Sequence, residues 1–300
     1  MMEFPVRPIT LAAGCLLLAA CASGAGTTAP PAGPAPSPGE PAPPPPPPGG
    51  RGPAVTFRSV QGAPYRVERH DSLTLQYEGG ASQEQLRDRT AFVRLSLAPG
   101  AAGSYRVTIL LDSLSAWENG VPVPPDSAAA VRGTQWTATL SPAGELQGLQ
   151  ANRKSVLGDE LATTLRLLLP RIPQGGVREG MEWSDTTKYE VVADAFPGTE
   201  AATMAYRAEE ADAGGDRKAI ALESSGTYQR SGTRLQGEQE LEMTANGTRK
   251  ASHRIAIEGT VLSAQGSETG DMTISVPALG QTVPVKQSSS YSITAASGTR

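Results

Sequence analysis

The stretch Tyr105-Arg106-Val107-Thr108-Ile109-Leu110-Leu111 decides the fold, because every second residue in it is large and apolar. Side chains of a β-strand point alternately to the two faces of a sheet, so this pattern predicts a strand with one buried face. The same alternation recurs at Val93-Leu95-Leu97, Trp136-Ala138-Leu140, Ile220-Leu222, Leu241-Met243 and Met272-Ile274-Val276. We therefore expect a mainly β protein with about ten strands in one large curled antiparallel sheet, a half-barrel or open barrel.

Turn signals separate these strands and indicate a meander. They are Pro99–Gly103, Glu118–Gly120, Pro142–Gly144, Gly214–Asp216 and Asn246-Gly247, the last of which is typical of a type I′ hairpin turn. The polar segment Ser82–Arg89 is interpreted as a loop with one helical turn.

One segment has helical instead of alternating periodicity. Between Ser155 and Leu169, the residues Leu157, Leu161, Leu165 and Leu168 recur at helical spacing. Ser155 can cap the start, and Pro170 cannot continue a helix. The pattern predicts one amphipathic helix over 155–169, which packs its leucines on the concave face of the sheet.

The amino terminus carries an apolar run from Ile9 to Ala22 that closes with Leu18-Ala19-Ala20-Cys21. The run is shorter than the roughly 20 residues that span a bilayer, and its length is typical of a cleaved signal. Small residues directly before a cysteine resemble the signal of bacterial lipoproteins. That resemblance implies a signal peptide over 1–20, a lipidated Cys21 and, because Ala22 follows it, an outer-membrane lipoprotein. A rival site at Cys15 lacks the favoured apolar residue three positions earlier.

The segment after Cys21 is predicted to be a disordered, proline-rich linker over 21–53. It holds 13 of the 26 prolines and almost no apolar side chain larger than alanine. Such a composition cannot form a packed core and favours an extended chain. A ligand for a proline-binding groove is the alternative interpretation.

The remaining residues, 54–300, are expected to form a single β domain. They contain 24 basic and 28 acidic residues, interspersed along the chain. That balance argues against nucleic acid, which requires a basic face. No cysteine follows Cys21, so the domain has neither a disulfide framework nor a cysteine metal site.

The sequence provides little evidence for catalysis. The two histidines, His70 and His253, sit in no recognisable catalytic motif and are expected to be exposed strand residues. Their separation provides no helical metal pair, and the acidic run Glu209–Asp212 lacks the spacing of a calcium loop. We predict no catalytic residue, no metal ligand and no cofactor, and an envelope hydrolase is the least favoured reading.

The order of elements resembles two groups of proteins. A meander interrupted by a helix that ends in leucine and proline, followed by Gly180-Met181-Glu182-Trp183, is similar to a class of uncharacterised bacterial lipoproteins. More distantly it resembles the half-barrel carriers typified by LolA and LppX. The second resemblance implies a curved sheet around a cavity for acyl chains.

The function predicted from these features is non-catalytic binding in the cell envelope. The protein is expected to bind the membrane through the acyl chains on Cys21. Its second expected partner is an apolar ligand or an envelope protein. A structural or assembly module that makes protein contacts without a cavity is the alternative. If there is a ligand cavity, we expect it to be lined by Leu157, Leu161, Leu165, Leu168, Trp136 and Trp183.

Overall fold

The computed structural model describes residues 49–77, 79–191, 196–212, 218–237 and 239–296. The predicted signal peptide, Cys21 and most of the proline-rich linker lie outside them. The strands of the main sheet are β2 (Val60–Gln76), β3 (Ser82–Pro99), β4 (Tyr105–Glu118), β6 (Gln135–Leu140), β7 (Leu146–Ala151), β9 (Glu182–Val191), β10 (Gly198–Asp212), β11 (Lys218–Gln236), β12 (Gln239–Ala256), β13 (Val261–Val276) and β14 (Gln281–Ala295).

Short elements complete the described part of the chain. Strand β1 (Arg51–Val55) pairs with β8 (Val177–Glu179), so the first strand begins three residues before the predicted start of the domain. Strand β5 (Val121–Pro122) pairs only with β4. The described helices are α1 (Pro125–Val131), α2 (Val156–Leu165) and the 3₁₀ turns η1 (Ala101–Gly103) and η2 (Pro277–Leu279).

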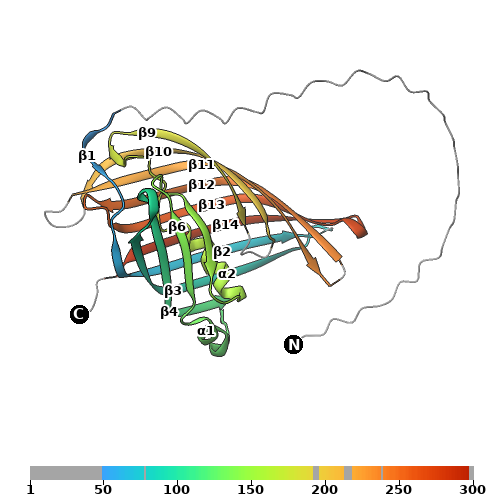
Figure 1. Cartoon of the computed structure of the whole chain (residues 1–300). Helices are drawn as coiled ribbons and strands as arrows, with labels where there is room; N and C mark the ends of the chain where they lie inside the picture. The colour runs from blue at the N-terminus through green and yellow to red at the C-terminus, as the bar shows by residue number, and fades with distance from the viewer. Residues whose placement is uncertain (1–48, 78, 192–195, 213–217, 238, 297–300) are drawn as a thin grey trace, which may run out of the picture. The chain divides into compact units, whose positions relative to one another are not determined.

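The main sheet is a strongly curled antiparallel half-barrel, as predicted (Figure 1). Its strand order is β7-β6-β4-β3-β2-β14-β13-β12-β11-β10-β9. Strands β9 to β14 follow one another as a meander, and β14 then pairs with β2 near the start of the domain. The sheet edges are therefore β7 and β9, which are consecutive in the chain apart from β8 and α2.

This order explains why a helix lies inside the curl. The chain leaves one edge of the sheet at Ala151 and joins the opposite edge at Glu182, so the segment between them crosses the concave face. Helix α2 lies in that segment. Its residues Leu161 and Leu165 pack in one core with inward side chains of β2, β3 and β4.

The helix is shorter than predicted. Ser155 caps it as expected, because its hydroxyl oxygen accepts a hydrogen bond from the Gly158 amide at 3.1 Å. Regular helix ends at Leu165, and the amides of Leu167 and Leu168 bond to carbonyls only three residues back. Pro170 then prevents a further turn. Leu168 is still fully buried, although it lies beyond the helix.

The structure corrects one local interpretation from the sequence and adds a helix that the sequence did not indicate. Ser82–Arg89, expected to be a loop, is the first half of β3 and pairs with β2 along its length. Its polar composition fits a strand near a wet part of the sheet. The short helix α1, which has Pro125 at its first position and three alanines, was not predicted.

The Asn246-Gly247 pair is not a turn; it lies in the middle of β12. The glycine is needed there because of Tyr228, on the neighbouring strand β11. A Cβ on Gly247 would lie 2.8 Å from Cε1 of Tyr228, and one on Gly270 of β13 would lie 2.5 Å from its hydroxyl. Both glycines make room for the Tyr228 ring, which lies over them.

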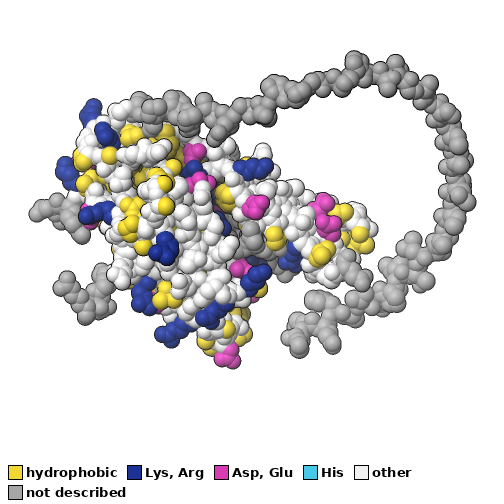
Figure 2. Space-filling model, viewed as in Figure 1, with side chains coloured by type: hydrophobic (Ala, Val, Ile, Leu, Met, Phe, Trp, Pro, Cys, Tyr) yellow, Lys and Arg dark blue, Asp and Glu magenta, His cyan; other side chains and the backbone are white. Residues whose placement is uncertain are grey.

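The buried residues form two apolar clusters. The larger joins α2 and the segment after it to β2, β3, β4 and β6, and the smaller contains Phe196, Ala202, Tyr228, Met243 and Ala245. Basic and acidic side chains are spread over the face in view without a single-sign patch (Figure 2). None of the described helices has the length and apolar character needed to cross a membrane.

Candidate binding site

An open hollow of about 1030 Å³ extends across strands β9 to β14. Three neighbouring rows of residues, in register across the strands, line it. The middle row runs from Trp183 on β9 to Tyr291 on β14. The three residues at its centre are small, namely Ser224, Ala251 and Gly266. No residue of α2 lines the hollow.

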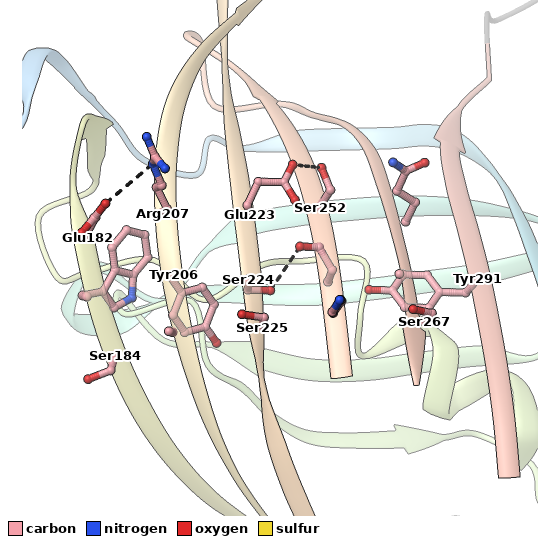
Figure 3. A pocket seen from close by; sticks show the side chains of 16 residues that line it. Glu182, Ser184, Tyr206, Arg207, Glu223, Ser224, Ser225, Ser252, Ser267 and Tyr291 are labelled. Atoms are coloured by element: carbon pink, nitrogen blue, oxygen red, sulfur yellow. Dashed lines mark hydrogen bonds and ion pairs between the residues drawn. The ribbon is translucent and has the colours of Figure 1, made fainter. Parts of the chain in front are cut away.

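The two flanking rows face away from the core. The charged row is Glu182, Arg207, Glu223, Ser252 and Gln265, and the serine row is Ser184, Ala205, Ser225, Lys250 and Ser267. All of these residues except Ser252 are exposed. Because side chains alternate along a strand, both rows point to the face opposite to the leucines of α2. Figure 3 shows several of them rising from neighbouring strands.

The charges around the hollow balance. Glu182 and Glu223 oppose Arg207 and Lys250, and the Arg207 Nε lies 3.6 Å from a Glu182 oxygen. The Ser252 hydroxyl donates to Glu223 at 2.6 Å. The hollow therefore offers hydroxyl, amide and paired charged groups, and it has no excess of either sign to attract an ion.

The aromatic pair of the middle row is packed against the sheet. The Trp183 and Tyr206 rings stack with centroids 5.1 Å apart and planes at 7°. Burial raises the pKa of Tyr206 to about 12. Its phenol is accordingly neutral at ordinary pH.

A second polar group lies on the concave face, next to the smaller apolar cluster. We call it the arginine belt: Arg249 of β12, Glu268 of β13, Glu200 of β10 and Tyr189 of β9. The Arg249 guanidinium donates to Glu268 at 2.7 Å and lies 2.9 Å from Glu200. The Tyr189 hydroxyl donates to the same Glu200 oxygen. The belt thus joins four of the six strands that form the hollow, from inside the sheet.

The environment of the belt keeps the Arg249 guanidinium charged. Burial alone lowers the pKa of Arg249, but the carboxylates of Glu268 and Glu200 outweigh burial and hold that pKa well above its ordinary value. Burial, together with the Glu200 charge, raises the pKa of Tyr189. The guanidinium also lies 5.2 Å from the centroid of the Tyr228 ring, a cation–π contact.

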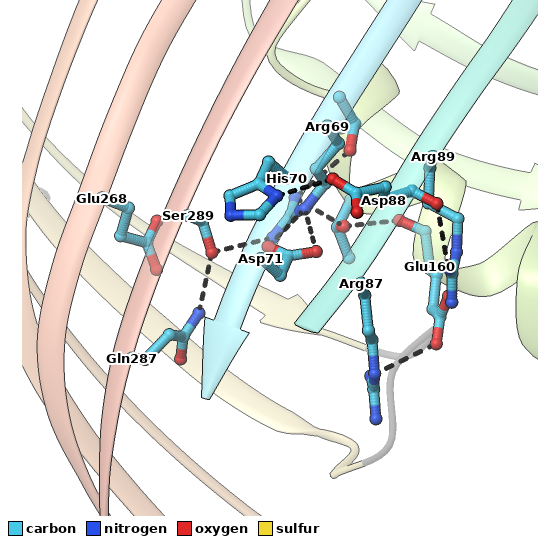
Figure 4. A network of polar contacts seen from close by, with 12 residues as sticks. Arg69, His70, Asp71, Arg87, Asp88, Arg89, Glu160, Glu268, Gln287 and Ser289 are labelled. Atoms are coloured by element: carbon cyan, nitrogen blue, oxygen red, sulfur yellow. Dashed lines mark hydrogen bonds and ion pairs between the residues drawn. The ribbon is translucent and has the colours of Figure 1, made fainter. Parts of the chain in front are cut away.

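Arginines also fasten α2 to the sheet (Figure 4). Arg89 of β3 is almost fully buried and donates to Glu160 of the helix at 2.9 Å and 3.0 Å. Arg87 reaches the same carboxylate at 3.3 Å. Arg69 of β2 contacts the hydroxyls of Thr163 and Thr164 at 3.2 Å. The polar side of α2 is therefore also held to the sheet, which fixes the helix in place.

The residues predicted to line a cavity occupy two different places. Leu161, Leu165, Leu168 and Trp136 are buried in the larger core cluster, and Leu157 packs against it. These five line neither the hollow nor a small one of about 10 Å³ near Tyr65. Trp183 is the member of the predicted set that lines the hollow.

Sequence reasoning missed the flanking rows and the arginine belt. Serines and charged residues at outward strand positions look like an ordinary solvated face. The signal for the belt was present, since Arg249 and Glu268 occupy positions that point inward by the alternation of β12 and β13. To predict that these residues meet, one must know the register in which the strands pair, and a single sequence does not provide it.

The histidines are in different settings. His70 is exposed, and its Nδ1 lies 2.6 Å from Asp88, as expected for a surface strand. His253 was expected to be exposed, but it is fully buried, and its Nε2 donates to the Leu167 carbonyl at 2.8 Å. Burial lowers the pKa of His253 to about 4. Within the described residues, no cluster of three or more histidine, cysteine or acidic side chains is placed to bind a metal.

Comparisons with known proteins provide little beyond the geometry. No protein-family model matches the chain, and no curated protein matches it. Among solved structures, DynF from the dynemicin biosynthesis pathway of Micromonospora chersina is similar at 12% identity, with 82% of this chain and 90% of that chain covered. Its TM-score is 0.22, too low for the likeness to carry an argument about fold or function.

Proposed function

We propose that this chain is a non-catalytic lipoprotein of the bacterial cell envelope that binds a ligand or partner at the hollow across β9 to β14. The observation that carries the proposal is the hollow itself. Its volume of about 1030 Å³ is at the upper end of the range for ligand sites, and it is built on long, well-paired strands. A half-barrel is compatible with ligand binding.

The position of the hollow changes where the ligand is expected. The sequence predicted an apolar ligand between the helix and the sheet, but the leucines of α2 are buried against inward side chains of the sheet. The hollow, in contrast, is open, and it combines polar side chains with a larger apolar lining surface. We therefore assign binding to the wall formed by β9–β14 and not to the space under α2.

Anchoring is the second part of the proposal. The Leu18-Ala19-Ala20-Cys21 signal supports lipidation of Cys21, and more than one acyl chain is needed for a stable anchor. Cys21→Ser should move the protein from the detergent phase to the aqueous phase in a phase-partition assay. Cys15→Ser is the control and should leave it in the detergent phase. An unmodified peptide running through Cys21 in the membrane-bound protein would contradict the proposal.

Binding at the hollow can be tested before the ligand is known. A photo-crosslinking amino acid in place of Ser225, in the serine row, should produce an adduct in cells that make the full chain. The same substitution at Thr137, exposed on the distant strand β6, is the control. Equal labelling at both positions, or none at either, would contradict binding at the hollow.

A structural or assembly role is the second candidate, and the edges of the sheet favour it. Strand β9 ends the strand order, and within the described part of the chain its ten residues pair only with β10. An extended segment of another protein can add to such an edge. A crosslinker at the exposed Lys188 of β9 distinguishes the two roles, because an assembly module would label there and not at Ser225.

A further inference from the structure

Three hairpin turns of the main sheet lie at one end of its strands. Because neighbouring strands are antiparallel, the turns that join β2 to β3, β11 to β12 and β13 to β14 all point the same way. Figure 1 shows the last two, in orange and red, at one end of the half-barrel and β1 at the other. We call the end with the three turns the hairpin end.

Each of the three hairpins exposes one large apolar side chain at this end. Leu235 is 76% exposed, Leu279 54% and Tyr77 43%, and no other large apolar side chain of the described residues is more exposed than Leu235. The remaining exposed ones lie on β3, β4, β5 and α2, namely Phe92, Trp117, Val121 and Val156. Single exposed apolar residues are normal, but a set on separate turns at one end indicates a surface that contacts something.

The hairpin between β13 and β14 also carries no charge. No charged residue occurs from Met272 to Val285. Pairing of β14 with β2 begins only at Val285, so the turn around Leu279 extends beyond that neighbouring strand. Val276 is half-buried, and Ile274 packs against the smaller apolar cluster. An apolar surface therefore continues from the projecting turn into the sheet, with no charged group whose burial would oppose its removal from water.

The predicted linker is long enough to bring the hairpin end to a membrane. Strand β1 pairs with β8, and the Gly180 amide next to β8 bonds to Ala208, the partner of Leu222 on β11. The stretch of β11 from Leu222 to Leu235 is about 43 Å long at the usual rise per residue. A proline-rich segment as long as 22–49 can reach up to about 85 Å. Cys21 and the hairpin end can therefore reach the same membrane.

We infer that the hairpin end contacts the lipid surface, with Leu279, Leu235 and Tyr77 inserted among the head groups. The inference rests on the proposed anchoring through Cys21. Apolar side chains inserted at this depth strengthen membrane binding in proportion to the area they bury, and tyrosine is typical of the membrane interface.

The arrangement of the three side chains favours lipid over a folded partner. None of the three lines either of the two hollows. One apolar side chain on each of three separate turns offers a protein few contacts, whereas a fluid lipid surface requires no matching shape. Their insertion would set the half-barrel with its strands upright on the membrane.

Fluorescence quenching in vesicles tests the inference on the full, lipidated chain. Cys21 is the only cysteine after the predicted cleavage site, and acylation blocks its thiol, so an introduced cysteine alone takes a thiol-reactive fluorophore. In phosphatidylcholine vesicles, the label on Leu279→Cys or Leu235→Cys should lose most of its emission to a lipid with a nitroxide on its acyl chain. Val156→Cys is the control, because Val156 is 75% exposed but lies on α2, and its label should keep its emission.

The outcomes separate this inference from the proposed anchoring. A chain that floats with the vesicles but whose Leu279 and Leu235 labels are quenched no more than the Val156 label would overturn the lipid contact alone. Shielding of the Leu279 label from a water-soluble quencher, without quenching by the lipid, would indicate a second copy of the chain and would also overturn it. Labelling of the parent at Cys21 would contradict the anchor alone, since the difference between Leu279 and Val156 still decides the contact. Absence of both flotation and quenching would overturn the two together.

Discussion

The concave face of this sheet is filled in two different ways. Near β2 to β4, Leu161, Leu165 and Leu168 form an apolar leucine face, and near β9 to β13 the arginine belt occupies the same side. Apolar burial contributes about 1.5 to 3 kcal/mol for each large side chain. A buried ion pair contributes little net stability, because the cost of desolvation offsets the attraction.

The belt has a different consequence, which is to select one strand register. Arg249 has exposed neighbours, Thr248 and Lys250, that point to the other face. A slip of β12 by one residue would bury one of them opposite Glu200 and Glu268 and would expose Arg249. The leucine face thus supplies stability, and we infer that the belt holds in register the strands that carry the hollow.

The largest effect is expected from a charge in the leucine face. Leu165→Asp places a carboxylate at a position with 0% exposure, a change that costs several kcal/mol. Urea unfolding should show loss of the cooperative transition or a greatly lowered midpoint. Val156→Asp, on the same helix but 75% exposed, should change the unfolding free energy little. A parent-like midpoint for Leu165→Asp would mean that the helix does not pack on the sheet in solution.

The belt should respond to the loss of one partner and tolerate the loss of all charges. Arg249→Leu leaves Glu200 and Glu268 buried without their cation and should cost about 3 to 5 kcal/mol. Arg249→Leu combined with Glu200→Gln and Glu268→Gln removes the unpaired charges and should recover most of that loss. Lys250→Leu, one residue away on the exposed face, is the control for the change in side chain.

The Arg249 variants also test whether the belt sets the strand register while the leucine face provides stability. If the belt sets register, the charge-free triple variant should fold stably but lose the labelling of Ser225 by a crosslinker, because the rows of the hollow no longer align. Full stability together with parent-like labelling would show that packing alone sets the register.

His253 of β12 holds the segment after α2 through the Leu167 carbonyl, and its burial makes the stability of the fold depend on pH. Burial lowers the pKa of His253 to about 4, whereas an ordinary histidine titrates near 6.5. The unfolded chain therefore binds a proton over this range that the folded chain does not, so stability falls as the pH drops from about 6.5 to about 4. The loss should approach about 3 kcal/mol, at 1.36 kcal/mol for each unit of pKa shift.

Urea unfolding at a series of pH values measures this dependence. In His253→Gln the steep part of the curve between about pH 6.5 and 4 should disappear, since glutamine does not titrate. His70→Gln, at the exposed histidine, should retain it. A parent curve that is flat between pH 4 and 6.5 would contradict the burial of His253.

The leucine face was predictable from the sequence, and the belt and hollow were not. Leucines at helical spacing identify a buried stripe without any knowledge of its partners, and alternation identifies each strand by itself. The hollow depends on which residues of six strands lie side by side. Asn246-Gly247 shows the difficulty, because the pair that signalled a turn instead makes room for a tyrosine of the neighbouring strand. Pairing between distant segments is information that local patterns lack.

The smallest effect concerns the start of α2, which belongs to the leucine face alone. The Ser155 hydroxyl accepts from the Gly158 amide, and removing such a cap costs about 1 kcal/mol. Ser155→Ala should lower the unfolding free energy by about that amount, while Ser155→Asp keeps an acceptor and should cost less. Labelling at Ser225 should be unchanged in both variants, because the arginines that hold Glu160, Thr163 and Thr164 still position the helix. A loss of labelling with Ser155→Ala would show that the helix and the hollow are coupled. The leucine face and the arginine belt would then not act independently.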